Sequence, residues 1–226
     1  MGLTEPAAKR QVDQQIPDEE VIRRVLGGEV ELYEIIMRRY NQRLYRAVRA
    51  VLGNDSDVEH VMQDAYVSAY THLGQFESRS SFSTWLTKIA IHEALAVKRK
   101  QNRFVTMDTA DSDNGFVSML VSNDPDPEKK LMDMELAALL EHSVEALPES
   151  YRSVFVLREV EKLDTRETAD CLGITEENVK VRLHRARALM RGELIARAGA
   201  ALSHTFQFHL SRCDRIVAAV MQRIAG

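Results

Sequence analysis

The chain has 226 residues, of which 45% are hydrophobic and 28% charged, and its formal net charge is −4. This composition excludes a disordered, fibrous or membrane-embedded chain, and the 6% share of aromatic residues favours helices over strands. Two cysteines are too few for a disulfide framework, and the N-terminus has no apolar signal segment, so we expect a cytoplasmic protein. A mildly acidic chain also differs from autonomous DNA-binding proteins, which are usually basic.

The first part of the chain has the periodicity of a compact all-helical domain, which we place at residues 18–104. It follows an aperiodic arm at 1–17 that we expect to be mobile. Apolar residues three and four apart, with Gly27-Gly28 and Gly53-Asn54 as breaks, define the helices. In chain order the predicted helices span residues 18–26, 29–52 and 58–73, followed by one that Ser80-Ser81 can cap and that runs into Lys98-Arg99-Lys100.

An acidic linker is predicted at 105–130. Thr106–Glu128 holds six acidic residues, no basic ones and two prolines, and it has no helical period. A second helical domain is predicted at 131–195, because an apolar stripe runs from Leu136 to Leu147 and further helical segments follow Pro148.

Two short helices at about 165–172 and 176–191 have the pattern of a helix-turn-helix. Gly173-Ile174-Thr175 joins them, Asp164 and Glu167 have the spacing of a capping box, and Ala169 is small where the helices would cross. Long cationic and amide side chains on the second helix suit contacts with phosphates and base edges. They are Asn178, Lys180, Arg182, His184 and Arg185. The plainer interpretation is a solvated basic face of a helical bundle.

A second basic segment runs from Lys88 to Arg103, with Lys98, Arg99 and Lys100 between them. Aromatic rings interleave with or precede these cations, a combination that suits the stacked bases of single-stranded nucleic acid. The interleaved and preceding rings are Phe76, Phe82, Trp85 and His92. The alternative is a helix with a basic end and a buried tryptophan.

The stretch Asp55–Glu77 has five acidic residues and no Lys or Arg, so it would repel DNA and suits contact with a protein. No catalytic constellation is found, since His-Glu-x-x-His, Gly-x-Ser-x-Gly and a Gly-rich phosphate loop are all missing from the sequence. His209 and Cys213 lie four apart, but two ligands are too few for a structural zinc site. We therefore expect no metal, no cofactor and no enzymatic activity.

Three segments, in this order, resemble extracytoplasmic-function sigma factors, the short members of the bacterial sigma-70 family. They are DVEHVMQDAYVSAYTHLGQF (57–76), SFSTWLTKIAIHEALAVKRK (81–100) and VKVRLHRAR (179–187). The resemblance covers about residues 18–195. It implies an all-α sigma factor whose first domain binds core RNA polymerase and the melted −10 promoter element, while the second domain binds the −35 element.

The resemblance also implies site residues by position. Asp57, Gln63 and Asp64 fall in the stretch that docks on the clamp helices of the largest core subunit. The −10 element would be held by Phe76, Ser81, Phe82, Trp85, Lys88, His92, Lys98 and Arg99. The −35 element would be contacted by Asn178, Lys180, Val181, Arg182, His184 and Arg185. Further implied partners are the polymerase flap, for the second domain, and an anti-sigma inhibitor.

A different class of protein, a stand-alone helix-turn-helix regulator, stays open as an alternative. It would need its own dimer surface and a ligand domain, and it leaves the aromatic-basic helix and the acidic stretch without a role. An enzyme has no supporting motif.

A C-terminal extension is predicted at 196–226, in which Leu210, Cys213 and Val217 begin an apolar seam that continues to Val220 and Ile224. We expect this seam to dock on the helices of the second domain, and the alternative is a regulatory surface. On either view Cys213 is expected to be a buried apolar thiol.

Overall fold

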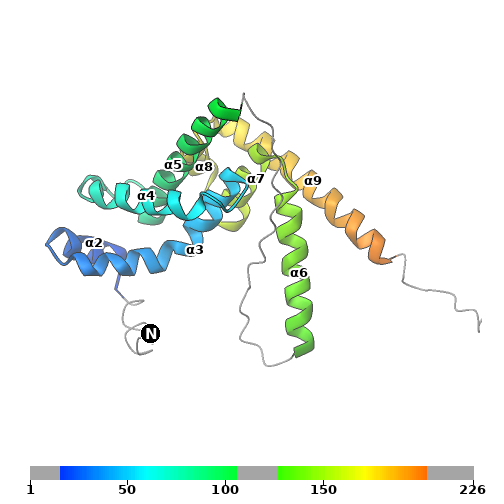
Figure 1. Ribbon diagram of the computed structural model, residues 1–226, viewed down its shortest axis with the longest axis horizontal. Coiled ribbons are helices and arrows are strands. Elements are labelled where there is room, and N and C mark those ends of the chain that lie inside the picture. The colour runs from blue at the N-terminus through cyan, green and yellow to red at the C-terminus, as the bar shows by residue number, and fades with distance from the viewer. Residues whose placement is uncertain (1–15, 106–126, 203–226) are drawn as a thin grey trace, which may run out of the picture.

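A computed structural model describes residues 16–105 and 127–202 (Figure 1). These two ranges contain helices, turns and loops but no strand, which agrees with the all-helical prediction. None of the helices in them is long and apolar enough to cross a membrane. The predicted arm, most of the linker and the apolar seam with Cys213 lie outside the described residues.

The first helical unit follows the predicted order closely. Its elements are α2 (Asp18–Leu26), η1 (Val30–Leu32), α3 (Tyr33–Leu52), α4 (Val58–Thr71), η2 (Leu73–Gln75) and α5 (Phe82–Val105). Gly53 ends α3 with φ +84°, a left-handed conformation that glycine adopts without steric cost, and its N–H bonds Arg49 O. Ser81 caps α5, because its Oγ accepts the backbone N–H of Thr84 at 3.1 Å.

The core of this unit lies where α3, α4 and α5 pack against one another. The apolar stripes predicted from the sequence supply it, as Leu44, Val61 and Leu86 are fully buried. Asp18 ties α2 to this bundle, since its carboxylate accepts hydrogen bonds from Arg39 and Tyr40 of α3.

The second helical unit comprises α6 (Pro127–Glu145), α7 (Glu149–Phe155), the π-helical turn η3 (Val156–Val160), α8 (Thr165–Leu172) and α9 (Glu176–Leu202). The prediction that the last helix ends near residue 191 is wrong, because α9 continues to Leu202. Residues 193–202 hold no proline, and Arg197 pairs with Glu193 one turn earlier at 2.7 Å, which supports the extra turns.

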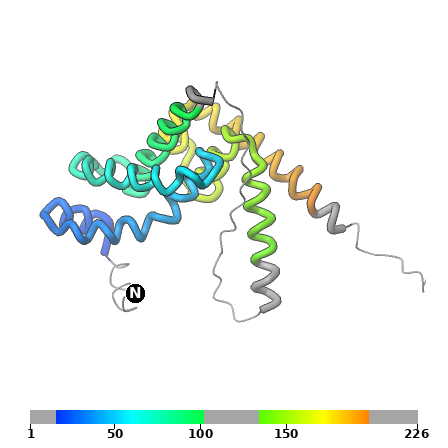
Figure 2. Tube along the Cα trace, in the orientation of Figure 1, coloured from blue at the N-terminus to red at the C-terminus, as the bar shows by residue number. Residues whose placement is uncertain are grey.

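The apolar stripe predicted from Leu136 to Leu147 is only partly buried. Leu147 is buried, whereas the side chains of Leu136 and Leu140 are 53% and 41% exposed. The coloured part of α6 and the stretch of α9 that follows the helix-turn-helix project away from the rest of the molecule (Figure 2). Periodicity alone predicted which residues share a face, but not whether that face meets a partner element.

The two helical units are packed together in the structure. α7 and η3 lie against α3, and α8 lies against α5. Leu157, Leu163 and Cys171 of the second unit belong to the same buried cluster as the core of the first. The second unit keeps two small clusters of its own, around Val154 and Leu183 and around Leu147 and Met190.

Candidate functional site

Three aromatic rings gather at the loop between η2 and α5. Ring centroids lie 5.3 Å apart for Phe76–Phe82 and 5.5 Å apart for both Phe76–Trp85 and Phe82–Trp85. Gly74, Phe76 and Trp85 line a surface pocket of about 590 Å³ together with the polar loop residues Gln75, Glu77, Arg79 and Ser80. This pocket has an aromatic wall and polar groups at its rim, which suits a planar heterocycle.

Phe82 differs in burial from the other residues predicted to contact the −10 element. Its side chain is only 3% exposed, and its ring packs on Tyr40 as well as on Phe76 and Trp85. A ring buried in this way supports its neighbours but has no face left for a nucleic acid strand. Ser81 is exposed, and its hydroxyl is engaged in capping α5.

The predicted cations of α5 fall into two groups. His92 and Arg99 are exposed and Lys88 is half-buried, and all three remain available along the helix. Partial desolvation of the ring, together with the charges of Lys88 and Arg99, lowers the pKa of His92, which favours the neutral imidazole. Lys98 instead makes contacts within the protein. Its Nζ donates to Val51 O at 3.0 Å and pairs with Glu149 Oε2 at 2.5 Å.

The helix-turn-helix forms as the sequence predicted. Asp164 accepts the N–H of Glu167 at 2.7 Å while Glu167 accepts the N–H of Asp164 at 2.9 Å, which completes the capping box of α8. Gly173 turns the chain with φ +65°, and Thr175 Oγ1 accepts the N–H of Asn178 to cap α9. Ala169 is buried where α8 crosses α9.

The outer face of α9 carries the predicted −35 contacts. Lys180, Val181, His184 and Arg185 are exposed, while Asn178 and Arg182 are half-buried. Arg182 Nε donates to Asn178 Oδ1 at 2.9 Å, and Arg185 Nη1 donates to Tyr151 OH at 3.3 Å. Both bonds hold long side chains in place on the helix before any ligand binds.

Of the predicted docking residues, Gln63 and Asp64 lie on α4 and Asp57 immediately precedes it, and their environments differ. Gln63 and Asp64 are exposed, and Asp64 Oδ2 lies 4.0 Å from His60 Nε2. Asp57 is half-buried, and its carboxylate accepts a hydrogen bond from Gln101 Nε2 of α5 at 2.6 Å. Asp57 therefore has a structural role in joining α4 to α5, whichever partner it meets.

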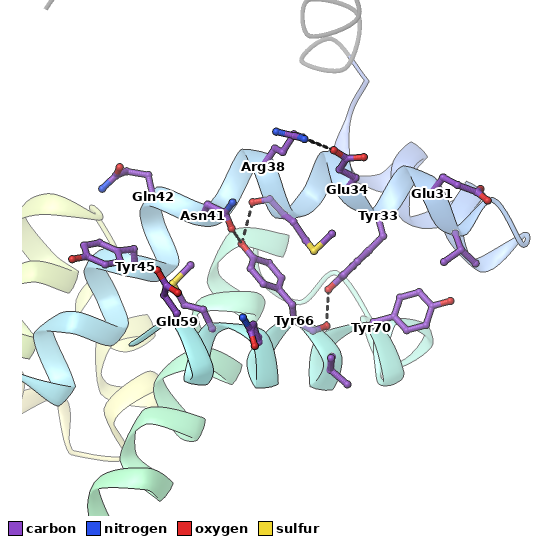
Figure 3. A pocket seen from close by; sticks show the side chains of 15 residues that line it. Glu31, Tyr33, Glu34, Arg38, Asn41, Gln42, Tyr45, Glu59, Tyr66 and Tyr70 are labelled. Carbon is purple, nitrogen blue, oxygen red and sulfur yellow. Dashed lines mark hydrogen bonds and ion pairs between the residues drawn. The ribbon is translucent and has the colours of Figure 1, made fainter. Parts of the chain in front are cut away.

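Next to Gln63 a groove of about 1090 Å³ opens between α3 and α4 (Figure 3). Tyr33 OH donates to Tyr66 O at 2.9 Å and Tyr66 OH donates to Asn41 Oδ1 at 3.0 Å, so the two rings form a fixed floor. Val67 and Tyr70, 66% and 40% exposed, complete an apolar wall. Neither residue was predicted as a site residue, although Val67 is an apolar residue outside the buried stripe of its helix.

Glutamates dominate the charged residues that line this groove, namely Glu31, Glu34 and Glu59 with the single cation Arg38. Arg38 pairs with Glu34 at 2.5 Å. An apolar floor with an acidic rim suits a helical partner of basic character. Within residues 16–105 and 127–202 no three His, Cys, Asp or Glu side chains gather as metal ligands would.

Two family models match the chain, Sigma-70 region 2 over residues 36–104 and Sigma-70, region 4 over residues 137–190. The ECF RNA polymerase sigma factor SigW of Bacillus subtilis is 28% identical over 176 residues, which are 76% of this chain and 94% of that protein. The ECF RNA polymerase sigma-E factor of Escherichia coli K12 is 27% identical over 179 residues, 78% of this chain and 93% of the relative.

Two solved structures share the fold. One is CnrH in complex with the cytosolic domain of CnrY, with 22% identity, a TM-score of 0.51 and coverage of 78% of this chain and 96% of that chain. The other is the sigma factor RpoE in complex with the anti-sigma factor NepR from Bartonella quintana, with 18% identity, a TM-score of 0.58 and coverage of 72% and 96%.

Proposed function

The chain belongs to the sigma-70 family as an extracytoplasmic-function sigma factor. From this premise we propose which of its surfaces bind the −10 element, the −35 element and core polymerase. It is an alternative sigma factor, which binds core RNA polymerase and directs it to promoters, and it is not an enzyme. The observation that carries the proposal is the presence of an aromatic cluster beside the cations of α5 and of a helix-turn-helix in one chain.

The first unit is proposed to hold the melted −10 element. The pocket between Phe76 and Trp85 takes one unstacked base, because an aromatic wall replaces the stacking that the base loses on leaving the duplex. Lys88, His92 and Arg99 continue along α5, where Lys88 and Arg99 neutralise backbone phosphates. Since the pKa of His92 is held low, its ring contributes hydrogen bonding or stacking without a charge.

The second unit is proposed to contact the −35 element through the N-terminal half of α9. Lys180 and Arg185 supply cations, Val181 supplies an apolar contact of the kind that suits a thymine methyl, and His184 supplies a donor. Asn178 and Arg182 are joined by a hydrogen bond, so both side chains are already positioned when they contact the −35 element.

Core polymerase is proposed to dock along α4, with its clamp helices on Gln63, Asp64 and the adjoining groove. The support is the combination of apolar residues, Val67 and Tyr70, with an acidic rim. Asp57 acts there mainly by joining α4 to α5. Because core polymerase and promoters are in the bacterial cytoplasm, the protein is proposed to work there.

An anti-sigma protein is proposed as a further partner. The two solved structures described above were determined with a bound protein, CnrY in one case and the anti-sigma factor NepR in the other. The net charge of −4 fits a protein whose two DNA-binding surfaces act only when they are tethered on polymerase, where each raises the effective concentration of the other.

Run-off transcription from a library of promoter fragments, with purified core polymerase and with or without this chain, tests the function. We expect specific transcripts only when both components are present. A stand-alone regulator would instead bind operator fragments by itself and would leave transcription by core polymerase without specific start sites.

A further inference from the structure

One apolar face of α6 is covered by α9 over only part of its length. Val144 and Leu147 belong to the same apolar cluster as Met190 of α9, where the two helices meet. Leu140 and Leu136 come one and two turns before Val144 on the same face, because residues four apart share a side of a helix. Both leucines are exposed, so the face continues beyond its cover. We call Leu136 and Leu140 the open face of α6.

The open face lies where α6 and α9 diverge, since each helix projects from the body of the molecule on its own (Figure 2). On α9 the apolar character continues past Met190 to Leu194, which is half-buried one turn later. The exposed large apolar residues of α9 are Val181, Leu189 and Ile195, which do not recur at intervals of three or four. Within the described parts of these two helices, the open face is therefore the exposed apolar surface that has the spacing of a stripe.

The segment of the chain that follows α9 has the sequence pattern that such a face binds. Its apolar seam runs from Leu210 to Ile224 with spacings of three and four. A single helix of about 15 residues is marginal in water, so a seam of this kind needs an apolar surface to pack on. Residues 203–209 connect the seam to the end of α9, and an extended segment of this length spans up to about 25 Å. This reach exceeds the roughly 18 Å by which α9 extends past Met190, so the seam can return to α6.

The two surfaces also carry opposite charges. Residues 133–145 hold four acidic residues and no Lys or Arg, whereas residues 203–226 hold three arginines and one aspartate. Opposite charges favour the pairing of these two segments, while a second copy of α6 on the open face would bring acidic residues against acidic residues. The groove between α3 and α4 also has an acidic rim, but α4 lies on the opposite side of the molecule from the end of α9 (Figure 1). Charge and reach together therefore favour the chain's own C-terminal segment as the occupant of the open face.

We propose that residues 210–224 of this chain dock as a helix on the open face of α6, with the apolar seam against Leu136 and Leu140. The docked segment lies beside α9 and completes the cover that α9 begins at Leu147. Docking removes both leucines from water and also covers Cys213, which is a member of the seam. This contact goes beyond the function proposed above and does not depend on it, because it forms within the free chain.

Cys213 offers a direct measure of docking, because it lies on the seam and is one of two cysteines in the chain. The other, Cys171, is fully buried, and burial raises its pKa to about 12, so maleimide at neutral pH should label only Cys213 in the folded full-length protein. Mass spectrometry of the digested protein identifies the labelled thiol. A synthetic peptide of residues 203–226 gives the labelling rate of an uncovered Cys213.

We expect Cys213 of the parent protein to label at least about tenfold more slowly than the peptide, and Leu136→Lys to remove most of this protection, because it places a cation on the apolar contact. Met134→Lys is the matched control, since it makes the same charge change at an exposed apolar position on a different face of α6. It should label like the parent. Cys171 should stay unlabelled in both variants, which verifies the fold, and Leu140→Gln should also reduce the protection. Peptide-like labelling of the parent, or full protection in Leu136→Lys, would overturn the proposal.

Sedimentation velocity distinguishes docking within one chain from docking between two copies. We expect the parent to be a monomer whose Cys213 protection is the same at all protein concentrations. A dimer that dissociates in Leu136→Lys, or protection that is lost on dilution, would assign the open face to a second copy and overturn the proposal. Protection that appears only after core polymerase is added would assign the seam to polymerase and overturn it as well. Failure of the sigma function would instead appear as the absence of specific transcripts with the parent protein and core polymerase.

Discussion

Single residues on α9 differ in how firmly the protein already holds them. Asn178 and Arg182 bond each other, and Arg185 donates to Tyr151, whereas Lys180 extends from an exposed position one turn into the helix. Residues near the N-terminus of a recognition helix are the ones that enter the major groove. Lys180 is therefore the residue whose removal tests DNA contact with the least disturbance of the fold.

Lys180→Ala should weaken binding to a −35 duplex by about 1–3 kcal/mol if the contact is base-specific, and the loss should be uniform across sequences if it is a phosphate contact. Arg191→Ala is the control, because Arg191 lies three turns further along nearly the same face of α9 and is also exposed. Holoenzyme formation in a core pull-down should be unchanged for both. Loss of core binding together with DNA binding would indicate misfolding and remove support for the assignment.

Phe82 and Phe76 have opposite roles within one aromatic cluster. Phe82→Ala should lower stability by about 3–5 kcal/mol, because it removes a ring that is almost completely buried. Phe76→Ala, at a half-buried position on the pocket, should lower the melting temperature less and binding of a −10 oligonucleotide more. Thermal melting measures the stability of both variants, and fluorescence anisotropy measures their binding of the −10 oligonucleotide. Equal melting temperatures for the two variants would contradict the structural role of Phe82.

At the scale of elements, local chemistry begins and ends the helices that form the surfaces. The capping box of α8 and the Thr175 cap of α9 satisfy backbone N–H groups that have no partner within the helix. α4 differs, because its start is stabilised by a contact from another helix, the bond from Gln101 to Asp57. These two situations predict different responses to substitution.

Asp164→Ala should destabilise the second unit by about 0.5–2 kcal/mol through loss of the bond from the N–H of Glu167. Asp170→Ala removes the same charge from the last turn of α8, where a negative charge opposes the helix dipole, so it should be neutral or slightly stabilising. Chemical denaturation of the two variants measures the difference. A larger loss for Asp170→Ala would mean that the capping box contributes little.

Asp64→Lys should reduce affinity for core polymerase while leaving the melting temperature nearly unchanged, because an exposed charge contributes little to folding but can determine an interface. Asp57→Lys should lower both, since it also breaks the bond to Gln101. Glu19→Lys, at an exposed position on α2, is the control for the change in net charge. Wild-type core affinity of Asp64→Lys would place docking elsewhere.

For the whole molecule, the shared core couples the two units. Unfolding of either one exposes Leu157, Leu163 and Cys171, so the two should melt together while the contact persists. Burial raises the pKa of Cys171 to about 12, so the thiol of the folded protein stays protonated and unreactive at pH 8. The same thiol in an unfolded chain ionises near its ordinary pKa of about 8.5.

Calorimetry at low salt should therefore show a single unfolding transition for the parent protein. In Glu145→Lys a second cation replaces the carboxylate that lies 2.7 Å from Arg49 Nη2, so the contact between the units should weaken. We then expect two transitions, because each unit keeps buried clusters of its own. Glu135→Lys, the same charge change at an exposed position of α6, should keep the single transition. Two transitions already in the parent would show that the contact is too weak to couple the units.

The amino-acid sequence by itself determined the helices, their caps and the helix-turn-helix. Apolar periodicity, the Asp164–Glu167 capping box and the left-handed turn at Gly173 all act between residues a few positions apart. The sequence also placed aromatic rings beside cations at the start of α5. Both regions of the sigma-70 family were recognisable from such short segments.

Only the tertiary structure decided what each of these side chains meets. Phe82 is in the core, Asp57 is bound to Gln101, Lys98 is paired with Glu149, and Val67 and Tyr70 form the wall of a groove. Tyr40 beside Phe82, Gln101 beside Asp57 and Glu149 beside Lys98 each lie on another element, at a separation along the chain that no local pattern encodes. The contact between the units depends on burial and charge complementarity across that distance, and these exist only once the helices have packed.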